Sequence, residues 1–172
     1  SDKGELCLFD PTGVTCKTFF SAQELKVTSG IMKTALDASG RLYVATAGNG
    51  VLMYDDKGWH PYLALEELIP SNHVRAFAQD ALGFLWLATE TGLYQIEPAA
   101  DRVVQRFTSA NTPFPVEAIT TLYAAPSGGL WVGGQGAAYF DGVQWQSYTK
   151  ADGLAAEQVQ AIAGDAQQRI WF

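Results

Sequence analysis

The chain has 172 residues, of which 48% are hydrophobic and 17% charged, and its formal net charge is −7. These values describe a folded globular protein with a substantial core and exclude a disordered chain. They also exclude nucleic acid as the main partner, because phosphate backbones need clustered basic residues and only 11 scattered lysines and arginines occur. No apolar run reaches the roughly 20 residues that span a bilayer, so we expect no membrane-spanning segment.

The first predicted element is a hairpin over residues 5–20, and it carries both cysteines of the chain, Cys7 and Cys16. With a two-residue turn Cys7 faces Cys16, whereas a type I turn followed by a bulge places Cys16 opposite Leu8. The turn sequence Asp-x-x-Gly favours the bulged form. A disulfide, which would favour an oxidising compartment, and two small buried thiols are therefore both open.

A sequence pattern then recurs along the chain, and its aromatic positions Tyr43, Trp86, Trp131 and Trp171 lie 43, 45 and 40 residues apart. The first two copies read LDASGRLYVAT at 36–46 and QDALGFLWLAT at 79–89. The last two read AAPSGGLWVGG at 124–134 and GDAQQRIWF at 164–172. Self-similarity at this period indicates one supersecondary unit repeated along the chain.

The second unit indicates what each copy forms. Its β-branched, aromatic and apolar runs are separated by Gly, Asp, Asn and Pro, which predicts four short strands at 74–80, 84–89, 93–97 and 102–107. The second strand does not alternate apolar with polar residues, so both faces of the sheet must be covered. A β-propeller meets this demand, because each blade is packed between two neighbours. Pro61 in the fourth strand of the first unit suits an outer edge.

Acidic turns join the first and second strands. In the Asp-x-x-Gly tetrads that begin at Asp37 and Asp80, the carboxylate is expected to accept hydrogen bonds from backbone N–H groups, while glycine adopts positive φ. A metal site built from Asp37, Asp80 and Asp165 is not predicted. Each aspartate belongs to its own blade, and Ala125 stands where the third unit would carry one.

Residues 154–168 resemble a helix locally, because they are rich in Ala, Glu and Gln. Aligned with the repeat they fall on the first strand, and we let the repeat overrule the propensity. Short helical turns are expected only between blades, at 21–28 and 63–68. The predicted fold is an all-β propeller of four-stranded antiparallel blades in a single domain over 1–172, with blades at 1–20 (half), 31–63, 74–107, 118–148 and 159–172 (half).

The number of blades in the complete ring stays open. If the two ends of the chain were joined, Trp171 and Phe9 would lie 10 residues apart, as Trp86 and Ile96 do. The alternatives are a closed four-bladed propeller, a head-to-tail dimer of eight blades, and a piece of a larger propeller. A fourfold ring needs bulky residues near its axis, whereas these first strands are rich in alanine. We therefore expect part of a larger propeller.

The stretch IPSNHVRAFAQDALGFLWLATETGL at 69–93 resembles the two-component regulator propeller repeat, and weaker copies extend the likeness over nearly the whole chain. Ala45 and Ala88 stand where that family usually has glycine. The resemblance implies a propeller like the periplasmic sensor regions of bacterial hybrid histidine kinases, which often recognise polysaccharide breakdown products, or like secreted and surface proteins. A periplasmic or secreted location and a role in signal transduction follow only as implications of that resemblance.

Candidate ligand-binding residues lie in loops that the usual propeller topology gathers on one face. Asn49, Glu90 and Gln135 occupy matching positions between second and third strands, while His73 and Asn111 lie in the connections between blades. Polar side chains there could bind a hydroxyl-rich ligand through hydrogen bonds. Solvated loop residues are the plain alternative. Two histidines on separate elements make no metal site, which needs about three or four ligands.

Aromatic residues of the outer strands allow two interpretations. Trp59 and Trp145 begin fourth strands and could stack on sugars, although such residues more often fasten the outer strand to its neighbour. Tyr94 and Tyr139 follow on third strands, where packing between blades is the expected role.

Taken together, these patterns predict a non-enzymatic recognition module that binds a small polar or carbohydrate ligand, or a protein. The alternative is a structural or assembly subunit that docks onto a larger complex, and self-association that completes a propeller belongs to the same class. A propeller polysaccharide lyase or hydrolase is the least favoured, because the loops offer no nucleophile–base pair and no Gly-x-Ser-x-Gly elbow. No catalytic residue, metal or cofactor is predicted.

Overall fold

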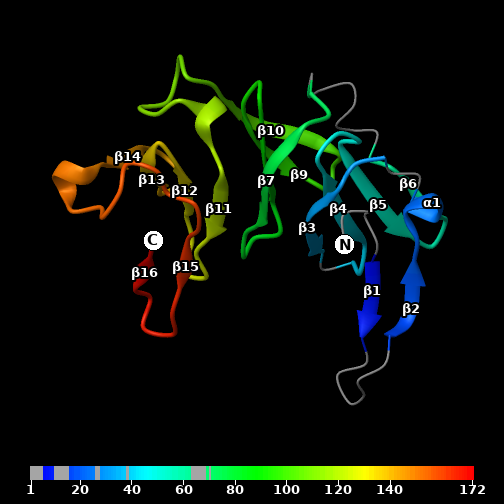
Figure 1. Ribbon diagram of the computed structural model, residues 1–172. Coiled ribbons are helices and arrows are strands. Elements are labelled where there is room, and N and C mark those ends of the chain that lie inside the picture. Colours follow the sequence, from blue (N-terminus) through cyan, green and yellow to red (C-terminus); the bar gives the residue numbers. More distant parts are fainter. Residues whose placement is uncertain (1–5, 10–15, 26–27, 38, 63–68, 70) are drawn as a thin grey trace.

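The computed structural model describes residues 6–9, 16–25, 28–37, 39–62, 69 and 71–172. These residues form three four-stranded antiparallel sheets and two two-stranded ones (Figure 1). The predicted all-β architecture of three complete blades and two half blades is confirmed. No helix in the described part of the chain has the length and apolar character needed to cross a membrane.

Each complete blade is an up-and-down sheet in which consecutive strands pair. The first blade comprises β3 (Ile31–Leu36), β4 (Leu42–Thr46), β5 (Val51–Asp55) and β6 (Gly58–Pro61). The second comprises β7 (Val74–Gln79), β8 (Leu85–Thr89), β9 (Leu93–Glu97) and β10 (Arg102–Phe107). The third comprises β11 (Thr121–Ala124), β12 (Leu130–Gly134), β13 (Gly136–Phe140) and β14 (Trp145–Tyr148).

The half blades lie at the two ends of the chain. They consist of β1 (Leu6–Phe9) with β2 (Cys16–Phe20), and of β15 (Ala163–Gly164) with β16 (Ile170–Trp171). The two pairs are separate sheets at opposite ends of the arc in Figure 1. The closed four-bladed ring, in which both halves complete one blade, is therefore not the arrangement found, because no ladder joins β16 to β1.

First strands lie innermost and fourth strands outermost. The first strands β3, β7 and β11 are neighbours across the blades, and Figure 1 shows them running side by side down the middle of the molecule. The strands β6, β10 and β14 form the outer edges of their sheets. The placement of Pro61 on an edge strand is thereby confirmed, since proline cannot donate to an inner ladder.

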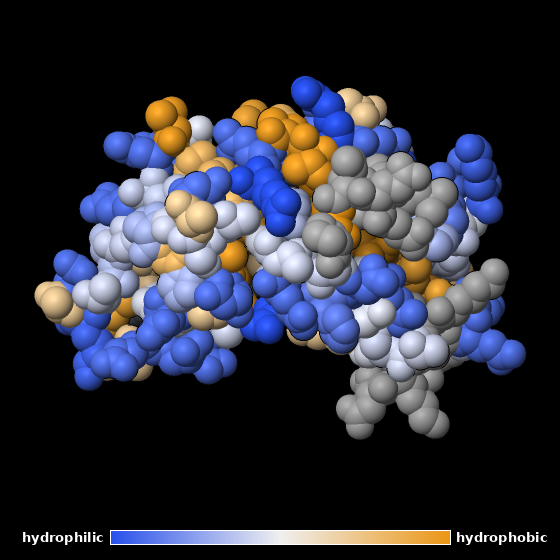
Figure 2. Space-filling model, turned by 90° about the horizontal axis from the view of Figure 1, so that it is seen from above, coloured by the Kyte–Doolittle hydropathy of each residue, from blue (hydrophilic) through white to orange (hydrophobic). Residues whose placement is uncertain are grey.

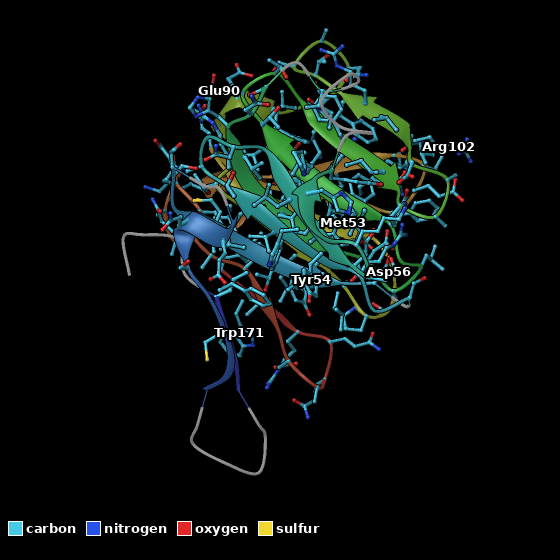
Figure 3. The ribbon with its side chains drawn as sticks, turned by 90° about the vertical axis from the view of Figure 1, so that its right-hand side faces the viewer. Met53, Tyr54, Asp56, Glu90, Arg102 and Trp171 are labelled. Carbon is cyan, nitrogen blue, oxygen red and sulfur yellow. The ribbon has the colours of Figure 1, made fainter. Side chains whose placement is uncertain are left out.

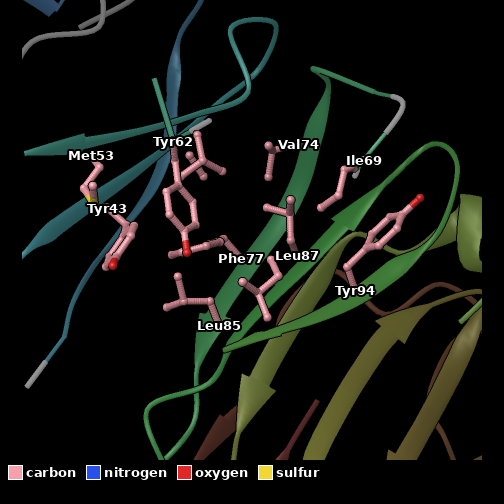
Figure 4. Packing of buried hydrophobic residues seen from close by; sticks show 12 residues of the cluster. Tyr43, Met53, Tyr62, Ile69, Val74, Phe77, Leu85, Leu87 and Tyr94 are labelled. Carbon is pink, nitrogen blue, oxygen red and sulfur yellow. The ribbon is translucent and has the colours of Figure 1, made fainter. Parts of the chain in front are cut away.

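The core lies between the sheets, as the two-sided apolar second strands require. Tyr43 of β4 and Leu87 of β8 belong to a buried cluster between the first and second blades, shown in Figure 4. Trp86, on the opposite face of β8, belongs to a second cluster with Leu122 and Phe140 of the third blade. All five side chains of β8 are buried, which is the physical reason for its uninterrupted apolar sequence.

The helical segments among the described residues are short and lie between blades. They are α1 (Ala22–Leu25) and the 3-10 turns η1 (Val116–Ala118) and η2 (Lys150–Asp152). Residues 154–168 contain no helix, so letting the repeat overrule helix propensity was right. The helical turn expected within 21–28 is present as α1, whereas the one expected at 63–68 lies outside the described residues.

The register of the first hairpin differs from both registers that the sequence suggested. Cys7 pairs with Phe19 and Cys16 with Phe9, across an irregularity between Leu8 and Phe9. The prediction that Cys16 faces Cys7 or Leu8 was therefore wrong, because six residues, not a tight turn, separate the paired Phe9 and Cys16. Cys7 is disulfide-bonded. Its pairing with Cys16, whose side chain lies outside the described part, stays a prediction.

Candidate functional site

Loops from several blades meet on one face, which we call the mouth face. It comprises loops 47–50 and 90–92, residue 135, and the described parts of the connections between blades. Hydrogen bonds tie these segments together: Gly50 N donates to Asn72 O at 2.9 Å, and Gly136 N donates to Glu157 O at 2.7 Å. This face is uppermost in Figure 1, and Figure 2 looks down on it, where hydrophobic patches lie among hydrophilic side chains.

The side chain of Asn49 is engaged in holding the chain before β3. Its Oδ1 accepts hydrogen bonds from Thr28 N at 3.0 Å and from Ser29 Oγ at 2.9 Å. Asn49 therefore fastens the loop after β4 to the connection that enters the same blade. Only its Nδ2 donors remain for a ligand.

Asn111 has a similar local role. Its Oδ1 accepts from Thr108 N at 2.6 Å, and its Nδ2 donates to Arg106 O at 3.2 Å. Both ends of the amide thus close the turn after β10, as asparagine side chains commonly do in loops. The nearby Thr108-Ser109 pair was the sequence signal that could have revealed this turn.

Glu90, Gln135 and His73 are exposed on the mouth face. Figure 3 shows Glu90 at the upper edge, at the end of the molecule opposite Trp171. Gln135 forms a backbone bridge with Gln158, and His73 N donates to Ser71 Oγ at 3.2 Å. Asn49 and Gln135 line two different cavities, so the geometry does not gather the predicted residues into one cluster. Their role as ligand-binding residues stays a prediction.

A larger opening lies between α1, loop 47–50 and the outer strand β6. This cavity, which we call the mouth-face groove, has a volume of about 350 Å³. Its polar lining consists of Glu24, Asn49, Trp59, His60 and Asn72. Sequence reasoning had singled out Asn49 and Trp59, but it had not joined them, because α1 and β6 meet only in the folded chain.

Glu24 is held in position by the start of α1. Its Oε2 accepts hydrogen bonds from Ser21 N at 2.8 Å and from Ser21 Oγ at 2.9 Å. The Ser21 backbone N–H, followed by the Ser21 hydroxyl, lowers the pKa of Glu24 below its ordinary value. The groove therefore presents a carboxylate that is ionised at neutral pH.

Trp59 and His60 form the outer wall of the groove. Trp59 packs edge-on against Phe20, with 5.3 Å between ring centroids, and its centroid lies 4.9 Å from that of Tyr54. This tryptophan therefore fastens the outer strand to its neighbours. Its Nε1 is buried and has no hydrogen-bond partner among the described residues. His60 Nε2 lies 3.1 Å from Asp55 Oδ2, which orients the imidazole along the strand.

Other aromatic positions of the repeat are packing residues. Trp145 contacts Phe107, Phe114 and Phe140 at centroid distances of 5.3, 4.8 and 4.8 Å. Tyr94 is fully buried in the cluster between the first two blades. Trp145 and Tyr94 are therefore packing residues, as expected.

Aspartates of the repeat are engaged in turns. Asp37 Oδ1 accepts from Ser39 N and Arg41 N, each at 2.9 Å, and Gly40 has φ of 80°. Asp80 makes the same two backbone bonds in the next blade. Within the described residues no group of three His, Cys, Asp or Glu side chains could hold a metal ion.

One stretch of the repeat matches a known family. Residues 68–91 match the family described as two component regulator propeller. This match covers the stretch in which the sequence resemblance is strongest. No curated protein sequence matches the chain.

Solved structures show the same fold. The extracellular domain of a hybrid two component system from B. thetaiotaomicron superposes with a TM-score of 0.70 and 23% identity, over 82% of this chain and 20% of that one. The extracellular domain of a one component system from the same bacterium gives 0.66 and 18%, over 81% of this chain and 18% of that one. This chain thus spans about a fifth of the length of those two domains.

An enzyme shares the fold as well. A catalytically inactive virginiamycin B lyase from Staphylococcus aureus, with quinupristin, superposes with a TM-score of 0.66 and 13% identity, over 92% of this chain and 53% of that one. Identity this low establishes a shared propeller architecture and nothing about chemistry.

Proposed function

Since this chain carries the two component regulator propeller repeat, we propose that it is part of a bacterial extracytoplasmic recognition propeller that binds a ligand and catalyses no reaction. We propose further that residues 1–172 form one segment of that propeller. Two of the similar structures are extracellular domains of signalling systems, which supports a periplasmic or secreted location. Propeller loops are suited to recognition because a rigid ring of sheets holds them in place.

The mouth-face groove is the observation that carries this proposal. Its volume of about 350 Å³ falls in the range of small-molecule sites, which is roughly 300–1,000 Å³. Carboxylate, amide and imidazole groups line it beside an indole, a combination suited to a hydroxyl-rich ligand such as a carbohydrate. Among the described residues that line the groove, Glu24 is the single carboxylate, whereas the common route of glycoside hydrolysis uses two.

Thermal-shift measurements with neutral mono- and oligosaccharides test the proposal. A ligand of the groove raises the melting temperature in a concentration-dependent way, because it binds only the folded protein. Asn72→Ala and Glu24→Gln should abolish that rise. Gln105→Ala, an exposed change on the outer strand β10, should leave it intact.

The outcome also separates the alternative roles. If no saccharide raises the melting temperature and a protein partner binds instead, the assembly role replaces ligand recognition. If saccharide binding survives Asn72→Ala and Glu24→Gln together, the groove is not the site. Cleavage of an added polysaccharide would contradict the non-enzymatic assignment.

A further inference from the structure

The innermost strands of the three complete blades line a separate cavity of about 150 Å³. Its polar side chains are Lys33 on β3, Arg75 on β7, and Thr120 and Thr121 at the start of β11. Because first strands lie innermost, this central cavity runs along the middle of the propeller. It shares no lining residue with the mouth-face groove between α1 and β6.

Charge distinguishes the central cavity from the rest of the molecule. The chain carries a net charge of −7, yet the cavity lining includes two cations and no acidic residue. Elsewhere arginines are neutralised by carboxylates, as in Arg41–Asp37, Arg102–Glu97 and Arg169–Asp165. Within the described residues, neither Lys33 nor Arg75 has a carboxylate within ion-pair distance. The hydrogen bond from Ser109 and, to a smaller extent, the positive charge of Arg75 lower the pKa of Glu117 below its ordinary value.

Arg75 keeps most of its hydrogen-bonding capacity. Its Nη1 donates to the backbone oxygen of Glu117 at 2.6 Å, and this bond fixes the guanidinium against the connection that enters the third blade. The Glu117 carboxylate itself accepts from Ser109 Oγ at 2.5 Å. A guanidinium has five N–H donors in a planar fork, so a second acceptor can still be held in a defined geometry.

The backbone of the inner strands explains why Arg75 reaches the cavity. The ladder shifts register between Val74 and Ala76, and it shifts at the matching place between Ile31 and Lys33. Such irregularities insert an extra residue and re-aim its side chain. The side chain of Arg75 is accordingly exposed, whereas Val74 and Ala76 beside it are buried.

We propose that the central cavity binds a small organic dicarboxylate, with Arg75 and Lys33 each holding one carboxylate. The proposal rests on the recognition function proposed above and names a ligand class for a second site. A cavity of about 150 Å³ accepts a molecule of roughly the size of benzene, which a four-carbon dicarboxylate matches. Thr121 adds a hydroxyl donor, whereas the Thr120 hydroxyl already donates to Val159 O at 2.6 Å. Met32, which is 51% exposed, provides apolar contact for the carbon chain.

Isothermal titration with succinate, and with succinamide as its uncharged analogue, tests this site. Succinate should bind and succinamide should not. Lys33→Gln and Arg75→Gln should each weaken succinate binding about tenfold or more, since each removes a charged hydrogen bond to a carboxylate. Lys57→Gln, an equal change of charge on the β5–β6 turn, should have no effect.

Each outcome decides the matter. Arg75→Lys keeps the charge and loses the planar fork, so intermediate weakening supports carboxylate recognition. Equal binding of inorganic phosphate would overturn the dicarboxylate assignment, and succinate binding that survives both glutamine variants would overturn the site. Absence of succinate binding, while a saccharide still stabilises the wild type through the mouth-face groove, would reject this inference and leave the proposed function standing.

Discussion

The carboxylate of Asp80 accepts a hydrogen bond from the indole Nε1 of Trp86 at 2.9 Å. This bond joins the turn after β7 to the aromatic position of β8, six residues later in the repeat. The same relationship recurs in two other units, at 3.2 and 3.1 Å, in the pairs Tyr43–Asp37 and Trp171–Asp165. In the third blade Ala125 replaces the acceptor, and Trp131 lies against Tyr139 at a centroid distance of 4.8 Å.

Removing the Asp80 carboxylate should destabilise the second blade. Asp80→Ala leaves the N–H groups of Leu82, Phe84 and Trp86 without their acceptor. We expect the free energy of unfolding to fall by about 2 kcal/mol or more, measured by urea denaturation, because a buried donor left unpaired costs about 1–3 kcal/mol.

Asp165→Ala is the matched control for that change. It removes the equivalent acceptor where the aromatic partner, Trp171, is 59% exposed and water can replace the bond. The loss should therefore stay below about 1 kcal/mol. Equal losses in the two variants would mean that burial of the aromatic partner is not what gives this bond its value.

Acid should weaken the first blade through Asp37. Burial raises the pKa of this carboxyl, but hydrogen bonds from Arg41 and its positive charge outweigh burial, so the pKa lies below its ordinary value. A lowered pKa in the folded state stabilises the protein above the unfolded pKa, about 4, and this stabilisation disappears as pH falls through the folded value. Asp37→Asn should therefore reduce the loss of stability with falling pH below about pH 4.

A urea-denaturation series at several pH values measures that slope. Asp56→Asn provides the control, because this exposed carboxylate on the β5–β6 turn accepts no hydrogen bond among the described residues. An unchanged acid slope in Asp37→Asn, together with an unchanged slope in the control, would show that the Asp37–Arg41 contact does not form in solution.

Packing between blades predicts a sharp contrast between two apolar positions of the second blade. Phe77 is fully buried in the cluster between the first two blades, whereas Leu82 in the β7–β8 turn is 84% exposed. Phe77→Ala should lower the free energy of unfolding by about 3–5 kcal/mol, and Leu82→Ala should change it by less than about 0.5 kcal/mol. Guanidinium denaturation measures both, and similar values would contradict sheet-on-sheet packing.

A disulfide between Cys7 and Cys16 should stabilise the first half blade. Closing a loop of this length restricts the unfolded chain and contributes about 2–3 kcal/mol. Under denaturing, non-reducing conditions the protein should release no free thiol, and peptide mapping should recover both cysteines in one linked fragment. Two titratable thiols, or an unchanged melting temperature after reduction, would count against the bridge.

Strand positions were predictable because the repeat imposes them. The predicted runs at 93–97 and 102–107 coincide with β9 and β10, and the predicted start of the second blade at residue 74 is where β7 begins. No helix was predicted for residues 154–168 despite their helix-like composition, and none is present. Packing between neighbouring sheets outweighs local helix propensity there. The register of the first hairpin was missed, because turn type cannot be derived from Asp-x-x-Gly alone when the connection is longer.

Sites were harder to predict than strands. Asn49 and Asn111 looked available on the sequence, but their amides are engaged with the neighbouring backbone. The mouth-face groove depends on α1 meeting β6, and the central cavity depends on register shifts in β3 and β7. Neither the contact between α1 and β6 nor the register shifts produce a periodic sequence pattern, so neither could be predicted from residue spacing.

The sequence by itself determined the propeller architecture, since an apolar strand recurring at a near-constant spacing can be buried on both faces only between copies of the same sheet. It also determined the acidic turns, whose carboxylates bond to their own backbone within a few residues. The tertiary structure alone decided which polar side chains remain free to meet a ligand. That choice depends on which distant segments the fold brings to one cavity, as it brings Glu24 and Asn72 to the groove and Lys33 and Arg75 to the central cavity.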